Sequence, residues 1–291
     1  MSLSRRRVLA VTACALGAPA SAAPRRWQGQ AMGADMAIKL RAPEAQARPA
    51  LEAALRVLRR IEAEFSLYDP ASRLMLLNRT GRLDAPSRDM RALLSLSDRV
   101  HILTGGLFDP SVQPLWKALS EGRAPDETRK DVGWSRVRVT AKAVELDPGM
   151  ALTFNGIAQG YATDRVADIL RANGLTDVLV DLGEQRALGG PWQLGLVDPE
   201  HGLLGQRTLT NAAIATSSPM ATPLASQGHI LHPTRSPLWS TVSVEAPEAA
   251  LADALSTALV LADQDEISAI RHALPSIRVT IVDPDGNLRT I

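Results

Sequence analysis

Apolar side chains recur at helical spacing in several long stretches of the chain. The first stretch follows Pro43 and ends near Phe65, with apolar residues three or four positions apart, as on one face of a helix. A second runs from Met90 to Leu103 and is followed by two glycines, which can terminate a helix. Further helices are predicted at residues 158–172 and 265–274, and the segment around Asp253 also has helical spacing.

Short segments rich in β-branched and apolar residues lie between these helices. Turn-forming residues at 283–286 predict a closing hairpin of residues 277–282 and 288–291. The other strands are predicted at residues 36–40, 137–139, 143–146, 177–182, 193–197, 208–215 and 241–244. The pattern therefore predicts an α+β fold, formed as a single domain of mixed sheets and helices by residues 23–291.

Residues 1–22 have the three parts of a cleavable export signal. Arg5, Arg6 and Arg7 precede an apolar run that is too short to span a bilayer, and Ala20-Ser21-Ala22 supplies small residues for cleavage. The paired arginines indicate export by the Tat route to the periplasm. The single cysteine, Cys14, lies inside this signal. Lipid anchoring at that cysteine is the alternative, but the apolar run before it is only about half the usual length.

The charge and composition of the mature chain disfavour nucleic-acid binding. Removal of residues 1–22 takes away three arginines and leaves 29 basic against 31 acidic residues, a formal charge of −2. Aromatic residues make up 3% of the chain, and there is no block of lysines or arginines. A surface that tracks phosphates and stacks on bases needs both.

The segment from Asn155 to Asp164 places two glycines, Gly156 and Gly160, where an apolar strand gives way to an amphipathic helix. Glycine lacks Cβ and lets a ligand approach the main chain, while the N–H groups at a helix start favour an anion. The turn is therefore a candidate site for a phosphate or a metal. Packing alone is the alternative explanation for such glycines.

A second candidate site lies on the helix around Asp253. Asp253 and Thr257 are four residues apart, so their carboxylate and hydroxyl groups share one helix face. Oxygen ligands of this kind suit Mg²⁺ when substrate phosphates complete its coordination. In the alternative interpretation, the aspartate interacts with the helix dipole and the threonine bonds to its own backbone. Asp164 and Asp168, also one turn apart, are interpreted as a solvated face.

Two familiar hydrolytic sites are disfavoured by the motifs. Ser217 and Ser218 are not part of a Gly-x-Ser-x-Gly turn, which disfavours a serine hydrolase. The five histidines show no His-Glu-x-x-His spacing, and the predicted mature chain has no cysteine, which disfavours zinc.

Several motifs appear in a specific order along nearly the whole mature chain. They are Met32-Gly33, Phe65 to Asp69 with Ser72 and Asn78, Gly106 to Val112, residues 155–164, Asp181-Leu182-Gly183, Trp192 to Pro199, Ala215-Thr216-Ser217, His229-Ile230 and the helix from Asp253 to Thr257. In this order and spacing the chain resembles the ApbE family of periplasmic FAD:protein FMN transferases, and most of all its NosX group. The resemblance implies a T-fold-related domain.

The resemblance also implies a reaction and its site. The family cleaves the FAD pyrophosphate with Mg²⁺, attaches FMN to a threonine of a partner protein and releases AMP. By this resemblance Asp253, Thr257 and Ser256 belong to the metal site, together with the carbonyl of Ala158. The implied FAD contacts are Met32, Tyr68, Leu107, Phe108, Asp109, Asn155, Tyr161 and Ile230.

Two residues are candidates for catalysis. The resemblance places His229 near the phosphates, where it would stabilise the departing AMP or position the acceptor; filling a strand is the alternative. Asp109 is a candidate general base, although an Asp-Pro pair in a loop often only forms a turn.

Four positions depart from the commoner family pattern. Gln159 replaces a lysine, Gly183-Glu184-Gln185 replaces Gly-Gly-Asp, His232 replaces an aspartate and Ser218 replaces a glycine. Because the implied metal ligands are intact, an active enzyme is favoured.

The acceptor implied by the NosX resemblance is a redox protein, such as a membrane-bound NosR-like protein of nitrous-oxide reductase maturation. Two alternatives remain. One is an FAD-binding carrier without catalysis, and the other is an FAD pyrophosphatase that gives free FMN and AMP.

Overall fold

One large antiparallel sheet organises the protein. The computed structural model describes residues 25–31, 34–224 and 228–291, so the predicted export signal, Cys14 and Met32 lie outside the described residues. The sheet has eight strands in the order β1-β2-β6-β7-β10-β11-β12-β13. Its strands are β1 (Arg25–Ala31), β2 (Ala34–Leu40), β6 (Val178–Asp181), β7 (Gln185–Leu188), β10 (Ala213–Ser217), β11 (Thr241–Ala246), β12 (Arg278–Val282) and β13 (Leu288–Thr290).

The sheet consists of two halves with the same order of elements. In each half a pair of antiparallel strands is followed by helices and then by a second antiparallel pair, and β7 pairs with β10 to join the halves. The helices are α1 (Glu44–Phe65), α2 (Arg73–Thr80), α3 (Arg88–Leu103), α4 (Gln113–Ser120), α5 (Ala158–Ala172), α6 (Ala249–Leu259) and α7 (Gln264–Ala273). The predicted α+β fold class is confirmed.

Most elements predicted from periodicity are present, and the differences are local. The sequence pattern missed β1, β7, α2, α4 and the short strand at residues 82–84. The strand predicted at residues 208–215 is in fact two strands, because Asn211 adopts a left-handed conformation with φ 48° and breaks the run. The side-chain oxygen of Asn211 accepts a hydrogen bond from the Gly189 N–H at 2.8 Å, which holds that turn in place.

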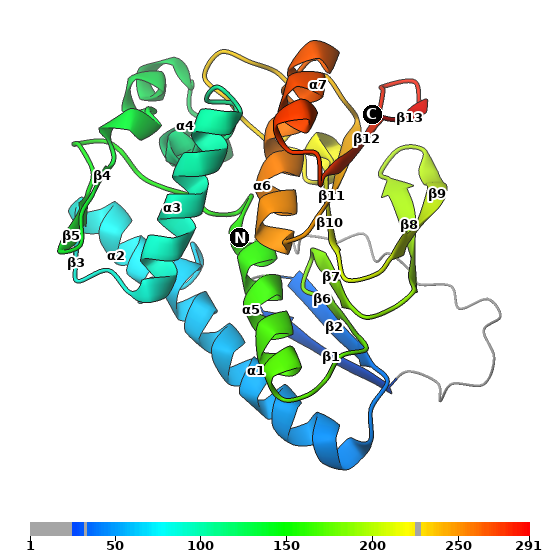
Figure 1. The fold of residues 1–291 in the computed structure, drawn as a ribbon. Coiled ribbons are helices and arrows are strands. Elements are labelled where there is room, and N and C mark those ends of the chain that lie inside the picture. Colours follow the sequence, from blue (N-terminus) through cyan, green and yellow to red (C-terminus); the bar gives the residue numbers. More distant parts are fainter. Residues whose placement is uncertain (1–24, 32–33, 225–227) are drawn as a thin grey trace.

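Helices α5 and α6 cover one face of the sheet. Figure 1 shows them following one another across the strands, with α3 to one side and the β8–β9 hairpin to the other. Helix α5 packs on α1, β6 and β7, while α6 packs on β10 and β11. The main core fills the space between the sheet and these helices, and includes Phe154, Ile157 and Leu255.

The N-terminal ends of α5 and α6 meet in the middle of the molecule. Asp164 of α5 accepts the N–H groups of Ala249 and Ala250, the first residues of α6, both at 2.9 Å. In return, Asp253 of α6 accepts the Gly160 N–H near the start of α5 at 3.0 Å. Each carboxylate therefore satisfies N–H groups that the other helix cannot satisfy itself.

The environment of Asp164 contradicts the solvated-face interpretation of this residue. Its side chain is buried, with a relative exposure of 3%, and it forms an ion pair with Arg186 of β7. Burial raises the pKa of Asp164, and the Arg186 guanidinium and the two backbone N–H groups act against that rise. Only Asp168, which pairs with Arg165 at 2.7 Å, is partly exposed as predicted.

Gly160 allows the two helices to come this close. A Cβ at this position would lie 2.4 Å from the carbonyl oxygen of Ala249, well inside contact distance. The second glycine of the turn thus serves helix packing, which was the alternative interpretation of the glycine pair.

Two smaller sheets flank the main one. The three-stranded sheet has the order β3-β5-β4, and the hairpin β8–β9 packs its own apolar cluster around Trp192 and Leu194. Their strands are β3 (Arg82–Asp84), β4 (Arg138–Val139), β5 (Ala143–Glu145), β8 (Trp192–Asp198) and β9 (Gly202–Leu209). Within the described ranges, no helix combines the length and apolar character needed to cross a membrane.

Replacing Asp164 by asparagine is expected to lower the free energy of unfolding by about 3 kcal/mol, because the buried Arg186 would lose its closest carboxylate and keep only that of Asp168, 3.8 Å away. Urea denaturation followed by circular dichroism measures this change. Asp168→Asn, one helical turn away and partly exposed, is the matched control and should cost less than about 1 kcal/mol. Equal effects of the two substitutions would contradict the role given to Asp164.

Candidate active site

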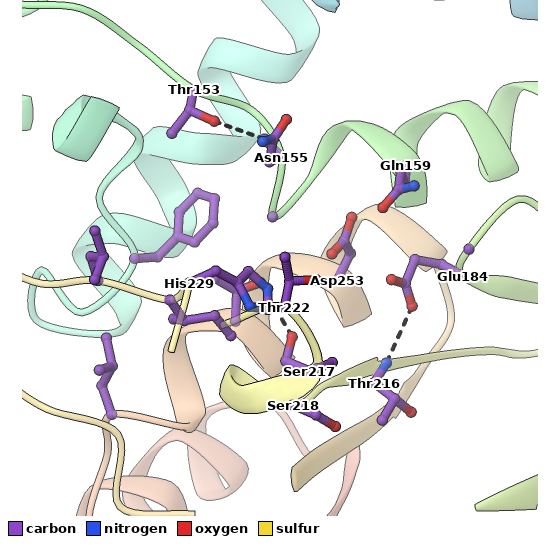
Figure 2. Close-up of a pocket in the computed structure, with 18 of the residues that line it drawn as sticks. Thr153, Asn155, Gln159, Glu184, Thr216, Ser217, Ser218, Thr222, His229 and Asp253 are labelled. Carbon is purple, nitrogen blue, oxygen red and sulfur yellow. Dashed lines mark hydrogen bonds between the residues drawn. The ribbon is translucent and has the colours of Figure 1, made fainter. Parts of the chain in front are cut away.

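A pocket opens where the N-terminal ends of α5 and α6 meet the end of β10. Its cavity volume is about 240 Å³, against about 20 Å³ for a smaller neighbouring pocket. Its walls come from segments far apart in sequence: residues 107–110, 153–159, 183–185, 216–218 and 229–231, together with α6. Figure 2 shows the polar side chains that line it.

Asp253 and Thr257 lie on the face of α6 that borders the pocket, as the spacing predicted. Asp253 is buried, and its Oδ2 accepts the Gly160 N–H, so the anion bound at the start of α5 is a carboxylate of the protein itself. A Cβ on Gly156 would lie 2.7 Å from Thr257 Oγ1. The first glycine of the turn therefore lets the main chain before α5 pack closely against the Thr257 side chain.

Glu184 supplies a second carboxylate to this part of the pocket. It is 8% exposed, and its Oε2 accepts the Thr216 N–H at 3.2 Å. Figure 2 shows the Asp253 and Glu184 carboxylates and the Gln159 amide pointing toward one another. Burial, and then the nearby Asp253 carboxylate, raise the pKa of Glu184 well above its ordinary value.

Glu184 was absent from the predicted site residues, although the departure from Gly-Gly-Asp had singled out its segment. Its position in the sequence could have identified it as a candidate, because a carboxylate that follows a buried strand and a glycine often lies at a site. The sequence could not show that this turn lies beside α6, which is distant along the chain.

The donor set around Asp253 fits a hard divalent cation. Two buried carboxylates and a hydroxyl border the same cavity, and the space beside Thr257 would be filled by a Cβ on Gly156. In the described part of the chain no three His, Cys, Asp or Glu side chains form a metal-binding group. A cation held here would accordingly draw on hydroxyl, carbonyl and substrate oxygens as well, as Mg²⁺ does.

His229 and Asp109 both line the pocket. His229 Nδ1 lies 2.9 Å from the carbonyl oxygen of Pro219. Because a carbonyl only accepts, Nδ1 carries the proton in the neutral ring and Nε2 is the acceptor nitrogen. Asp109 Oδ1 accepts both the N–H and the hydroxyl of Ser111, at 2.7 and 2.6 Å, so this aspartate also forms the turn that the alternative interpretation expected.

The predicted FAD contacts divide between the two pockets. Leu107, Phe108, Asn155 and Ile230 line the larger one. Tyr68, with a relative exposure of 57%, lines the smaller one, which shares Asn155 with the larger pocket. Gln159 also lines both, so the two pockets are neighbouring parts of one surface.

Two predicted residues lie apart from the main pocket. Tyr161 packs edge-on against Phe65 and donates its hydroxyl to Asp89 at 2.8 Å, so it belongs to the core between α5, α1 and α3. Burial and the Asp89 carboxylate raise the pKa of Tyr161. Ser256 is fully buried behind the pocket wall, where its hydroxyl contacts Ser217.

The remaining two predictions concern Ala158 and Met32. Ala158 begins α5 and borders the smaller pocket. Met32 lies outside the described residues, so its predicted contact with FAD stays a prediction.

The fold and the pocket define an α+β protein that gathers carboxylate and hydroxyl oxygens at the junction of two helix ends. The sequence profile of the ApbE family matches residues 32–281, and the chain belongs to that family. It is 27% identical to the FAD:protein FMN transferase of Treponema pallidum (strain Nichols), over 85% of this chain and 80% of that protein. It is 26% identical to the FAD:protein FMN transferase of Haemophilus influenzae, over 72% of this chain and 71% of that protein.

Solved structures share the same fold. The ApbE protein of Thermotoga maritima superposes with a TM-score of 0.81 at 24% identity, covering 91% of this chain and 96% of that one. The flavin transferase ApbE of Vibrio cholerae gives a TM-score of 0.78 at 22% identity, with 92% and 96% covered. These likenesses confirm the α+β architecture of the ApbE fold.

The raised pKa of Glu184 predicts how stability changes with pH in the absence of divalent metal. Between the ordinary glutamate pKa of about 4.3 and the raised value, the folded state binds more protons than the unfolded state. Stability is therefore expected to fall as pH rises through that window. Glu184→Gln should remove this loss and unfold at a higher temperature than the wild-type protein at pH 8.

Thermal unfolding at pH 5 and pH 8 with a chelator measures the effect of Glu184→Gln. Glu127→Gln, at an exposed glutamate, is the control and should follow the wild-type protein. A glutamine variant at position 184 with the same pH dependence as wild type would show that Glu184 is not the titrating group.

Proposed function

We propose that this protein is an FAD:protein FMN transferase that uses Mg²⁺, cleaves the FAD pyrophosphate, attaches FMN to a threonine of a partner protein and releases AMP. One observation carries the proposal: in a chain of the ApbE family, three separate segments bring Asp253 and Thr257 of α6, Glu184 and His229 into one pocket. The relatives named above as FAD:protein FMN transferases support it.

The oxygen-rich side of the pocket suits the diphosphate end of FAD. Asp253 and Thr257 would hold Mg²⁺, with Glu184 as a further oxygen donor in the same pocket and the Ala158 carbonyl as the donor that the family resemblance implies. When bound, the metal would neutralise charge on the phosphate oxygens as the phosphoanhydride breaks. Gly156 has no side chain, so the main chain before α5 lies close to Thr257 at this end of the pocket.

His229 is suited to handle the proton of the attacking hydroxyl. Its Nδ1–H donates to the Pro219 carbonyl, so the ring is oriented and Nε2 is the nitrogen able to accept a proton. In the proposed reaction the acceptor threonine loses its proton as its oxygen bonds to the phosphorus of the FMN half, and AMP leaves. Asp109 is less suited to act as the base, because one of its oxygens already accepts two hydrogen bonds from Ser111.

The apolar side of the pocket suits the rings of the substrate. Leu107, Phe108 and Ile230 are buried residues of the pocket wall, and apolar walls with a few polar groups are typical of cofactor sites. Tyr68 is exposed at the neighbouring smaller pocket, where its ring is available for stacking on the isoalloxazine or adenine.

The cellular setting is proposed from the N-terminal segment and from the NosX resemblance. Residues 1–22 support export by the Tat route, so we propose that the enzyme works in the periplasm and draws on FAD there. The proposed acceptor is a redox protein of the nitrous-oxide reduction system, such as a NosR-like membrane protein.

Three products distinguish the proposed transferase from its alternatives. The mature protein is incubated with FAD, Mg²⁺ and an acceptor domain bearing an Asp-Gly-x-Thr-Gly-type site, and the acceptor is analysed by mass and in-gel flavin fluorescence. An increment matching FMN that disappears with chelator is the expected result. Free FMN and AMP would support a pyrophosphatase, and unchanged FAD would support a carrier.

Asp253→Asn is expected to lower the transfer rate at least about 100-fold, because one carboxylate charge at the metal is lost while an oxygen remains for the Gly160 N–H. Thr257→Val, which keeps the side-chain shape, should also slow the transfer. Asp265→Asn, at an exposed position of α7, is the control. Transfer at the wild-type rate in Asp253→Asn, confirmed as folded by circular dichroism, would refute the metal assignment.

A further inference from the structure

Ser217 joins the end of β10 to the helix that carries the proposed metal ligands. Its Oγ lies 2.9 Å from Ser256 Oγ and 3.4 Å from Thr257 Oγ1. Ser217 is partly buried and lines the pocket, whereas Ser256 is fully buried behind it. The three hydroxyl groups therefore form a chain that begins with Thr257 and Ser217 at the cavity and ends at the buried Ser256 of α6.

The inner end of this chain determines the direction of its hydrogen bonds. Ser256 Oγ lies 3.0 Å from the main-chain carbonyl oxygen of Asp253, which has no proton to give. The single proton of Ser256 is thus donated to that carbonyl. Ser217 must then donate its own proton to Ser256 Oγ, because a hydroxyl has one proton and two lone pairs.

The direction of these hydrogen bonds also fixes where the Thr257 proton points. With its proton donated to Ser256, Ser217 can only accept from Thr257, and the Thr257 proton points to Ser217 along the longest of the three contacts. The lone pairs of Thr257 are then left for the cavity, which Thr257 lines. A metal ligand needs this arrangement, since a hydroxyl binds a cation through a lone pair.

We propose that Ser217 is a positioning residue that orients the Thr257 hydroxyl so that its lone pairs point to the metal. The inference rests on the proposed function, because it takes Thr257 as a ligand of that metal. Ser217 itself is not a ligand in this proposal, and it acts through Thr257.

Ser217→Ala tests the proposal by metal affinity as well as by activity. Binding of Mn²⁺ to the protein without nucleotide is followed by electron paramagnetic resonance of the free ion, and the Mg²⁺ dependence of flavin transfer is measured in parallel. Removal of such a supporting group is expected to weaken metal binding about tenfold and to raise the half-saturating Mg²⁺ concentration similarly. The rate at saturating Mg²⁺ should change much less.

Two further variants distinguish a loss of Thr257 orientation from a general structural effect of a substitution in the sheet. Ser217→Thr keeps the hydroxyl and should restore most of the metal affinity. Ser243→Ala is the matched control, because Ser243 on β11 is also buried and its hydroxyl makes a comparable 2.8 Å contact with Thr216 Oγ1. It has no part in the chain to Thr257, so its metal affinity should equal that of the wild-type protein.

The outcomes distinguish this inference from the proposed function. Wild-type metal affinity in Ser217→Ala, an equal loss in Ser243→Ala, or no recovery in Ser217→Thr would each overturn the role of Ser217 while leaving a functional metal site. A wild-type protein that neither binds Mn²⁺ nor transfers flavin would instead overturn the metal site and the proposed function together.

Discussion

The meeting of two helix N-terminal ends is the constraint on which the rest of this structure depends. Two such ends repel each other, since each carries partial positive charge and unsatisfied N–H groups. Asp164 and Asp253 remove the conflict, because each helix supplies the carboxylate that the other needs. Gly160 makes the approach sterically possible. Since α5 and α6 each cover one half of the sheet, this contact also joins the two halves of the fold.

The same contact couples stability to the proposed chemistry. Asp253 uses one oxygen for the Gly160 N–H while its side chain borders the pocket, so a structural capping group and a proposed metal ligand are one residue. Glu184 adds a second buried carboxylate whose charge is disfavoured there without a cation. Two like charges close together in a poorly solvated space lower the stability of the protein without a cation, and the same charges would favour binding of a divalent ion. The departure from Gly-Gly-Asp thus still places a carboxylate, that of Glu184, near Asp253, where it would support the proposed metal site.

Much of the candidate site could be predicted because it depends on short-range features. The four-residue spacing of Asp253 and Thr257, the start of α5 at Ala158 and the loop with Phe108 and Asp109 are visible in the sequence, and these segments do border the pockets. Tyr161 shows the limit of that approach. It lies in the same motif as Gly156 and Ala158, yet its side chain points into the core toward Phe65 and Asp89, because this face of α5 packs against α1.

The sequence by itself determined the helices and strands whose apolar residues repeat regularly, the α+β class and the shared helix face of Asp253 and Thr257, because periodicity and residue spacing are local properties. Only the tertiary structure decided that Asp164 is buried, that the glycines of the 155–164 turn accommodate Ala249 and Thr257, and that Glu184 and Ser217 lie beside α6. Those relations join residues separated by many positions in the chain. They arise from the pairing of strands and the packing of α5 against α6, and no local pattern in the sequence encodes such distances.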